Sequence, residues 1–220
     1  MALPATPVSG TNGADEELWG RHVDEMTVVP AAVPLDGSER FRGVDASVLD
    51  FWRFAMSDLR MNNVRGYLAE FLVARAVGAA GNRVEWDAYD VLTPDGVRVE
   101  VKVRGYLQSW AQKRVQLSPF QIKAAAPWDH ATGAFGEKGW NADVYVLCVH
   151  TAREHDAYDV LDVAQWEFYV LPRHVIVERA GAGMSLAWVQ EQSGGPTPYA
   201  ELAAAVTTAA AAGGGVGGGR

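Results

Sequence analysis

A tight turn between two stretches of alternating residues constrains this chain more than any other feature. The turn is Thr93-Pro94-Asp95-Gly96, in which proline presets φ for the first central position and glycine accepts the positive φ of a bulged type I turn. The flanking residues are therefore predicted to pair as an antiparallel hairpin. If the loop has three residues, Thr93 faces Val97 and, counting outwards, Asp90 lies opposite Glu100.

The second strand of this hairpin is predicted to have one charged and one apolar face. Side chains alternate between the two faces of a strand, so Glu100 and Lys102 share one face, while the valines at positions 99, 101 and 103 share the other, which suits a core. Asp90 joins the charged face across the hairpin. Asp87 lies three residues before Asp90 and should point to the opposite face, so it is only a reserve candidate for the same site.

Two carboxylates and a lysine on one face are typical of a site that hydrolyses phosphodiesters. Carboxylate oxygens hold Mg²⁺ while the ion keeps several waters and takes up phosphate oxygens. The metal activates water and stabilises charge on phosphorus, and the lysine orients the water or neutralises developing negative charge. The alternative is an ordinary solvated hairpin face, whose cross-strand charge pairs contribute about 0.2–1 kcal/mol each.

A helix is predicted upstream, over about residues 60–77, and it carries Glu70. Its apolar stripe follows the three-and-four spacing of a helix and is formed by Val64, Tyr67, Leu68, Phe71, Leu72 and Arg75, with Gly78 and Gly81 available to end it. Glu70 falls close to this stripe. Burying an unpaired charge is expensive, so either a metal or a basic partner is implied, with Arg75 or a distant lysine as the basic alternative.

The segment after the hairpin, residues 104–118, has the composition of a nucleic-acid contact. Arginine and lysine neutralise phosphates, glutamine bonds to base edges or phosphates, and aromatic rings stack on bases. The candidate contact residues are Arg104, Tyr106, Gln108, Ser109, Trp110, Gln112, Lys113 and Arg114. The alternative is a polar loop with a packed Trp110. A helix is then expected to start at Ser118, with serine as N-cap and proline in its first turn.

The order of a helix with Glu70, a strand end with Asp90, a strand with Glu-x-Lys, a helix and another strand resembles the PD-(D/E)XK nuclease superfamily, over about residues 60–175. The resemblance implies an α/β (α+β) fold with a restriction-endonuclease-like αβββαβ core, a central mixed β-sheet flanked by helices. It also implies that Asp90 and Glu100 bind the metal, that Lys102 assists the water and that Glu70 completes the site. One departure is Tyr89, which stands where the motif has proline.

The resemblance further implies a metal-dependent nuclease, specifically a Mg²⁺-dependent endodeoxyribonuclease that hydrolyses DNA phosphodiester bonds, with Mn²⁺ as a substitute metal and 5′-phosphate products. Because many members dimerise to cut both strands, a homodimer is an open alternative. A second hypothesis is a non-catalytic module that binds nucleic acid or a protein on the same fold, and a third is a structural domain without nucleic acid. The four residues Glu70, Asp90, Glu100 and Lys102 favour catalysis.

The charge distribution reconciles an acidic chain with a DNA partner. The formal net charge is −8, which by itself disfavours a polyanion. Residues 98–123, however, carry six basic side chains and one acidic side chain, whereas residues 1–50 carry three basic and nine acidic side chains. Basic charge therefore gathers beside the proposed site.

The 220 residues suit one compact domain. We expect a flexible N-terminus at 1–15, a helical extension packed on the core at 16–59, the nuclease-like domain at 60–200, and an Ala/Gly-rich tail at 201–220, disordered at its end. The single cysteine, Cys148, excludes a disulfide framework, and no export or membrane segment is evident. These features predict a cytoplasmic protein.

Overall fold

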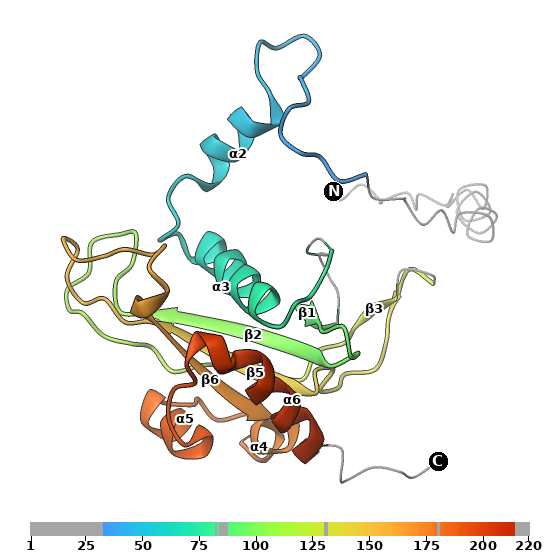
Figure 1. The fold of residues 1–220 in the computed structure, drawn as a ribbon, viewed down its shortest axis with the longest axis vertical. Coiled ribbons are helices and arrows are strands. Elements are labelled where there is room, and N and C mark those ends of the chain that lie inside the picture. The colour runs from blue at the N-terminus through green and yellow to red at the C-terminus, as the bar shows by residue number, and fades with distance from the viewer. Residues whose placement is uncertain (1–32, 82, 84–87, 130–131, 180, 214–220) are drawn as a thin grey trace, which may run out of the picture.

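The computed structural model describes residues 33–81, 83, 88–129, 132–179 and 181–213. In chain order the elements are α2 (Val48–Met56), α3 (Asn62–Ala76), β1 (Val91–Leu92), β2 (Arg98–Gly105), β3 (Trp128–Asp129), β4 (Ala134–Phe135), β5 (Val144–His150), β6 (Trp166–Pro172), α4 (Arg173–Glu178), α5 (Leu186–Ser193) and α6 (Leu202–Gly213), with short 3₁₀ turns at Val163–Gln165 and Tyr199–Glu201. Figure 1 shows the helices arranged around a central sheet.

The central sheet is mixed and has four strands in the order β1-β2-β5-β6. β1 pairs with β2 in antiparallel fashion, β2 with β5 in parallel, and β5 with β6 in antiparallel fashion. β3 and β4 form a separate small hairpin, in which the rings of Trp128 and Phe135 meet edge to face at 5.0 Å. β5 is buried along its whole length, as expected for an interior strand covered on both faces.

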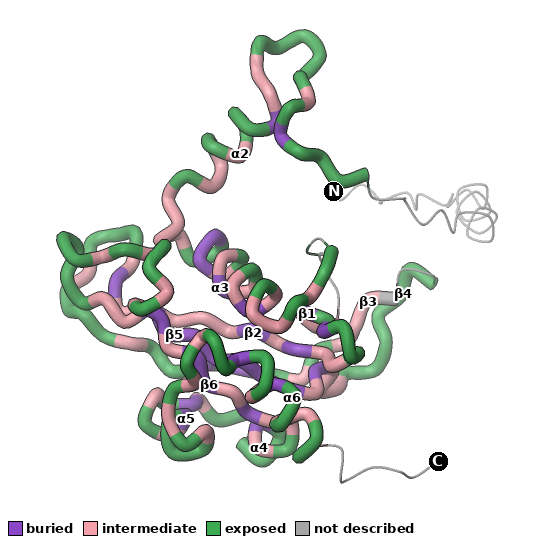
Figure 2. The backbone as a smooth tube through the Cα atoms, viewed as in Figure 1, coloured by how far each residue is buried: buried purple, intermediate pink, exposed green. Residues whose placement is uncertain are grey.

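The two faces of the sheet are covered by different helices. On one face, Ala69 and Val73 of α3 and Leu202 and Val206 of α6 pack on the valines of β2 and β5. On the other, α4, α5 and residues 117–122 pack on the alternate side chains of β5 and β6, among them Tyr145. Figure 2 shows that buried residues concentrate in the sheet and in parts of the helices beside it.

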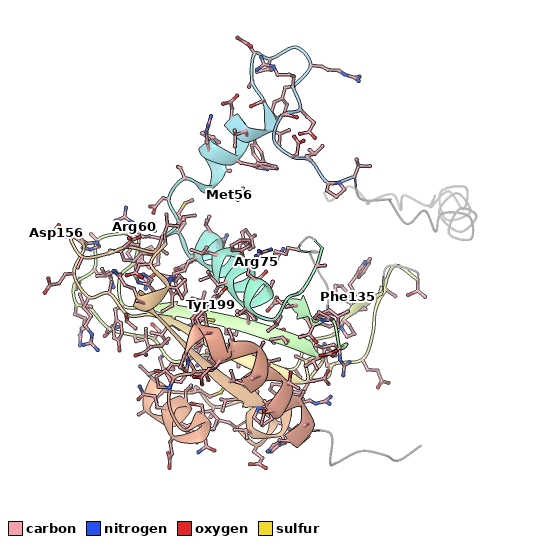
Figure 3. All side chains as sticks on the ribbon, viewed as in Figure 1. Met56, Arg60, Arg75, Phe135, Asp156 and Tyr199 are labelled. Carbon is pink, nitrogen blue, oxygen red and sulfur yellow. The ribbon has the colours of Figure 1, made fainter. Side chains whose placement is uncertain are left out.

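Contacts at both ends of α3 help to fix its position. Tyr199, labelled in Figure 3, donates a hydrogen bond from its hydroxyl to the carbonyl of Leu72 at 2.9 Å and so ties the 3₁₀ turn before α6 to α3. At the other end of the helix the loop after β5 approaches, where Figure 3 labels Arg60 and Asp156. There the Arg60 guanidinium lies 5.9 Å from the centre of the Tyr158 ring.

The helical extension expected at 16–59 contains one helix among its described residues, α2, with Ser47 as its N-cap and a reciprocal bond to Asp50. In Figure 1 it stands apart from the sheet, beyond the start of α3. Phe51 and Phe54 of α2 are exposed, while Trp52 packs over Gly37, where an added Cβ would come within 2.9 Å of the Trp52 ring. Residues 16–32, the first part of the expected N-terminal extension, lie outside the described residues.

The expected apolar stripe of α3 is only partly right, since Leu68 and Leu72 do pack against the core. The buried face of α3 carries Val64, Arg65, Ala69 and Val73, and Phe71, which was placed in the apolar stripe, is 58% exposed. The stripe is therefore rotated from the expected one, because the sheet contacts the side of the helix with the small residues. α3 does end as expected, with Gly78 at a φ of 68°.

The helix expected from Ser118 does not form, and residues 118–127 contain only isolated bridges, at Phe120 and Ala125. Phe120 and Ile122 are buried in the core of the second face, and Phe120 exchanges two backbone hydrogen bonds with Met184. Burial of alternate side chains thus overrides the helix-start signal of Ser-Pro.

The expected α/β fold, a mixed sheet flanked by helices, is confirmed. The connection between the parallel strands β2 and β5 contains the small β3–β4 hairpin and, among its described residues, no helix. None of the helices described reaches the length and apolar character that crossing a bilayer requires.

Candidate active site

The hairpin brings Asp90 opposite Glu100, in the register expected from its turn. Val91 pairs with Val99, the Thr93 amide donates to the Val97 carbonyl at 3.0 Å, and Gly96 has a φ of 81°. The Asp90 amide donates to the Val99 carbonyl at 3.0 Å, and one oxygen of its carboxylate accepts from the Val101 amide at 2.7 Å. The backbone of β2 therefore holds the Asp90 carboxylate in place beside Glu100.

Lys102 lies against both carboxylates. Its Nζ donates a hydrogen bond to Oε1 of Glu100 and lies 3.8 Å from Oδ2 of Asp90. In β2 the intervening Val101 and the preceding Val99 are buried in the core on the opposite face. The alternation of β2 thus places two carboxylates and one ammonium together at the rim of the sheet.

Burial and mutual charge shift the pKa values of this group. Burial raises the pKa of Glu100, and the charge of Asp90 adds to the rise, while the ammonium of Lys102 opposes it. For Lys102, burial acts to lower the pKa, but the charges of Glu100 and Asp90 outweigh it and the pKa is raised. The lysine therefore stays protonated because the carboxylates surround it.

Glu70 faces the same group from α3. Its side chain is 14% exposed, and its Oε2 accepts a hydrogen bond from Nε of Arg83 at 2.7 Å. Arg83 also lies over the ring of Tyr67, 4.6 Å from the ring centre. Burial raises the pKa of Glu70, with a further rise from Asp90. The basic partner that the sequence implied is thus Arg83, neither Arg75 nor a lysine.

The donors suit a hard divalent cation, although the described residues contain no ready cluster of three His, Cys, Asp or Glu side chains for a metal. Lys102 contacts Asp90 and Glu100, and Arg83 contacts Glu70. Glu70, Asp90 and Glu100 are carboxylates whose side chains are each less than a quarter exposed. Carboxylate oxygens are the ligands that Mg²⁺ takes. The reserve candidate Asp87 lies outside the described residues.

A groove runs beside this group, between α3, the rim of β2 and the segment that follows β2. Among the described residues that line it are six basic side chains and one acidic side chain, Glu70. The basic ones are Arg65, Arg83, Lys102, Arg104, Lys113 and Arg114. In a chain with a net charge of −8, this concentration makes the groove the natural place for a polyanion.

Of the eight candidate contact residues, six line the groove: Arg104, Gln108, Trp110, Gln112, Lys113 and Arg114. Tyr106 instead packs against the core of the second face, with the Arg153 guanidinium 4.1 Å from its ring centre. Ser109 is exposed outside the lining. Trp110 is 55% exposed, so it is available to a ligand rather than packed.

The two glutamines also hold the loop in shape. Gln112 accepts from the Gln108 amide at 2.8 Å and donates to the Tyr106 carbonyl at 3.0 Å, while Gln108 donates to the Gly105 carbonyl at 2.9 Å. Sequence reasoning missed two of the basic lining residues, Arg65 and Arg83. Arg65 was detectable, because it stands four residues before Ala69 on a helix face that is otherwise apolar.

The fold and the site define an α/β protein with a carboxylate–lysine group beside a basic groove, and comparison with known families places it among the endonucleases. The model of the bacteriophage T4 endonuclease IV family matches residues 49–187, well over half of the chain and all four site residues. The protein belongs to this family. A search of curated proteins gave no match.

Proposed function

We propose that the protein is a Mg²⁺-dependent endodeoxyribonuclease of the PD-(D/E)XK, restriction-endonuclease-like type. Membership in an endonuclease family supports the reaction class. The observation that carries the rest is the hairpin, which holds Asp90 opposite Glu100 with Lys102 bound between them. A solvated hairpin face would not need carboxylates this far buried, nor a basic groove beside them.

Asp90, Glu100 and Glu70 would hold the metal, which supplies an activated water and charge stabilisation at phosphorus. The Val101 amide fixes the Asp90 carboxylate, so one ligand is preorganised. Engaging a cation requires Lys102 and Arg83 to leave the carboxylates. Lys102 is then free to orient the attacking water, and Arg83 is free to meet a phosphate oxygen at the groove wall.

DNA is the proposed substrate because the groove offers cations, an exposed indole and amides together. Lys113 and Arg114 are exposed and line the groove, where they would neutralise phosphates. Trp110 offers a stacking face. The acidic remainder of the chain lowers affinity for polyanions elsewhere on the surface, which directs binding to this groove.

The test is nicking of supercoiled plasmid in Mg²⁺ or Mn²⁺, with EDTA as the metal-free control. Lys102→Ala and Glu100→Gln should each reduce cleavage by at least 100-fold, within the usual range for acid–base or electrostatic groups. The matched control is Lys138→Ala, which removes an exposed lysine outside the groove and should cut as the wild type does. Undiminished cleavage by Lys102→Ala would reject the assignment.

A further inference from the structure

Arg65 is a buried cation on the inner face of α3. It is 3% exposed and precedes Ala69 and Val73 on the face that packs on the sheet. It also contributes to the lining of the groove. An arginine is almost never buried to this extent unless it is paired, so its partners indicate its role.

Among the described residues, the atoms that accept hydrogen bonds from Arg65 are neutral. One terminal nitrogen donates to the Leu107 carbonyl at 2.8 Å, and the other donates to Oδ1 of Asn62 at 2.8 Å and to Oε1 of Gln108 at 3.0 Å. Its Nε is buried without a hydrogen-bond partner in the described structure. None of the ion pairs found among the described residues includes Arg65.

Within the described part of the chain, no carboxylate therefore neutralises the charge of Arg65. Burial lowers its pKa, and the like charge of Arg104 adds to the effect, while the Tyr158 hydroxyl opposes it. Holding an unpaired cation out of water costs free energy. A neutral side chain could fill the same space without this cost. The presence of a charge there therefore indicates a partner that the ligand supplies, an anion.

Gly105 provides the place where the guanidinium lies. A Cβ at Gly105 would come within 2.8 Å of a terminal nitrogen of Arg65, so Arg65 rests directly on the backbone at the end of β2. Gln108, which Arg65 contacts, in turn donates to the Gly105 carbonyl. Arg65 thus joins α3, the end of β2 and the groove loop.

We propose that Arg65 is a positioning residue for one backbone phosphate of the nucleic acid. Its charge makes the floor of the groove attractive to a phosphate beside the end of β2, and its hydrogen bonds hold the loop around Gln108 in the shape that receives it. The inference rests on the proposed function for its ligand, a nucleic acid. It concerns binding rather than the chemical step.

The test is binding of a fluorescein-labelled oligodeoxynucleotide, single-stranded and duplex, followed by anisotropy in EDTA between 50 and 300 mM salt. Arg65→Met should bind about tenfold more weakly, and the slope of log K against log salt should become shallower by about 0.7 for single strands or 0.9 for duplex, the value for one phosphate. The matched control is Arg53→Met, which removes an exposed arginine outside the groove and should leave both quantities unchanged.

Two further variants keep the charge and separate it from the packing. Arg65→Lys loses the hydrogen-bond fork, and Gly105→Ala displaces the guanidinium, so each should weaken binding several-fold while the salt slope stays at the wild-type value. Circular dichroism and thermal unfolding check that each variant is folded. If Arg65→Met does not fold, these two carry the test: wild-type affinity in both would overturn the proposal, as would a shallower slope in Arg65→Lys.

Kinetics provide the second readout and separate the two proposals. In cleavage assays Arg65→Met should raise KM about tenfold and leave kcat within about twofold, whereas a catalytic role would lower kcat. Wild-type affinity and salt slope in Arg65→Met overturn the inference and leave the nuclease intact. A wild-type protein that binds with the expected dependence on Arg65 but never cuts rejects the nuclease and keeps the inference.

Discussion

Replacing Lys102 with methionine should destabilise the metal-free protein and make its stability depend strongly on Mg²⁺. Nζ of Lys102 lies 3.8 Å from Oδ2 of Asp90 and binds Glu100 as well. At an effective dielectric constant of about 20, a pair of unit charges at 3.8 Å attracts by about 4 kcal/mol. Burial of the ammonium offsets part of this, which leaves a loss of about 2–3 kcal/mol when the lysine is removed.

Urea unfolding with and without Mg²⁺ measures this loss directly. In EDTA the free energy of unfolding of Lys102→Met should be about 2–3 kcal/mol below that of the wild type, or roughly 5–10 °C in Tm for a chain of this size. Mg²⁺ should then stabilise the variant by about 2.7 kcal/mol at a concentration 100 times its Kd. The wild type should gain less, because its lysine must first leave the carboxylates.

Two results would refute this reasoning. Equal stabilisation of variant and wild type by Mg²⁺ would mean that the metal does not engage the carboxylates that Lys102 contacts. A variant as stable as the wild type in EDTA would mean that the charges are solvated. Lys138→Met, at an exposed position, is the control and should change neither quantity.

Three further predictions concern the fold. Hydrogen bonds from Arg98 lower the pKa of Asp143 below 3.8. This interaction therefore stabilises the fold above pH 3.8, and the stabilisation is lost as pH falls through the depressed pKa. Asp143→Asn should lower the free energy of unfolding by about 2 kcal/mol at pH 7, and by progressively less in urea titrations at lower pH. Val73→Ala should cost about 2 kcal/mol, whereas Phe71→Ala should change the urea midpoint little, since only Val73 is fully buried. Gly96→Ala should lower the free energy of unfolding by about 1–2 kcal/mol, which thermal unfolding would detect as a lower Tm. The added Cβ meets open space, so the cost comes from holding alanine at the φ of 81° that Gly96 has.

The hairpin could be predicted from sequence because its determinants are local. Proline and glycine set the turn, the turn sets the register, and the alternation in β2 sets the face. The juxtaposition of Asp90, Glu100 and Lys102 follows from these three steps alone. No knowledge of the rest of the chain is needed.

Other features depend on contacts between distant segments. α3 has two stripes at helical spacing, one through Phe71 and one through Ala69 and Val73, and the sheet selects the one with smaller residues. The burial of Phe120 against residues near Met184 overrides the Ser-Pro signal. The partner of Glu70, Arg83, lies thirteen residues further along the chain, and no periodic pattern predicts such a pairing.

The shortness of β1 affects the handling of this protein. The opposite border of the sheet is protected, because Thr197 donates to the Phe168 carbonyl on β6 at 2.7 Å. Beyond the two residues of β1, side chains cover the outer edge of β2: Asp90 accepts from Val101, Arg104 donates to the Val103 carbonyl, and Gln108 donates to the Gly105 carbonyl. Substitution of Arg104 or Gln108 in the groove should therefore uncover strand edge, which promotes self-association. Light scattering should accompany every activity measurement on such variants.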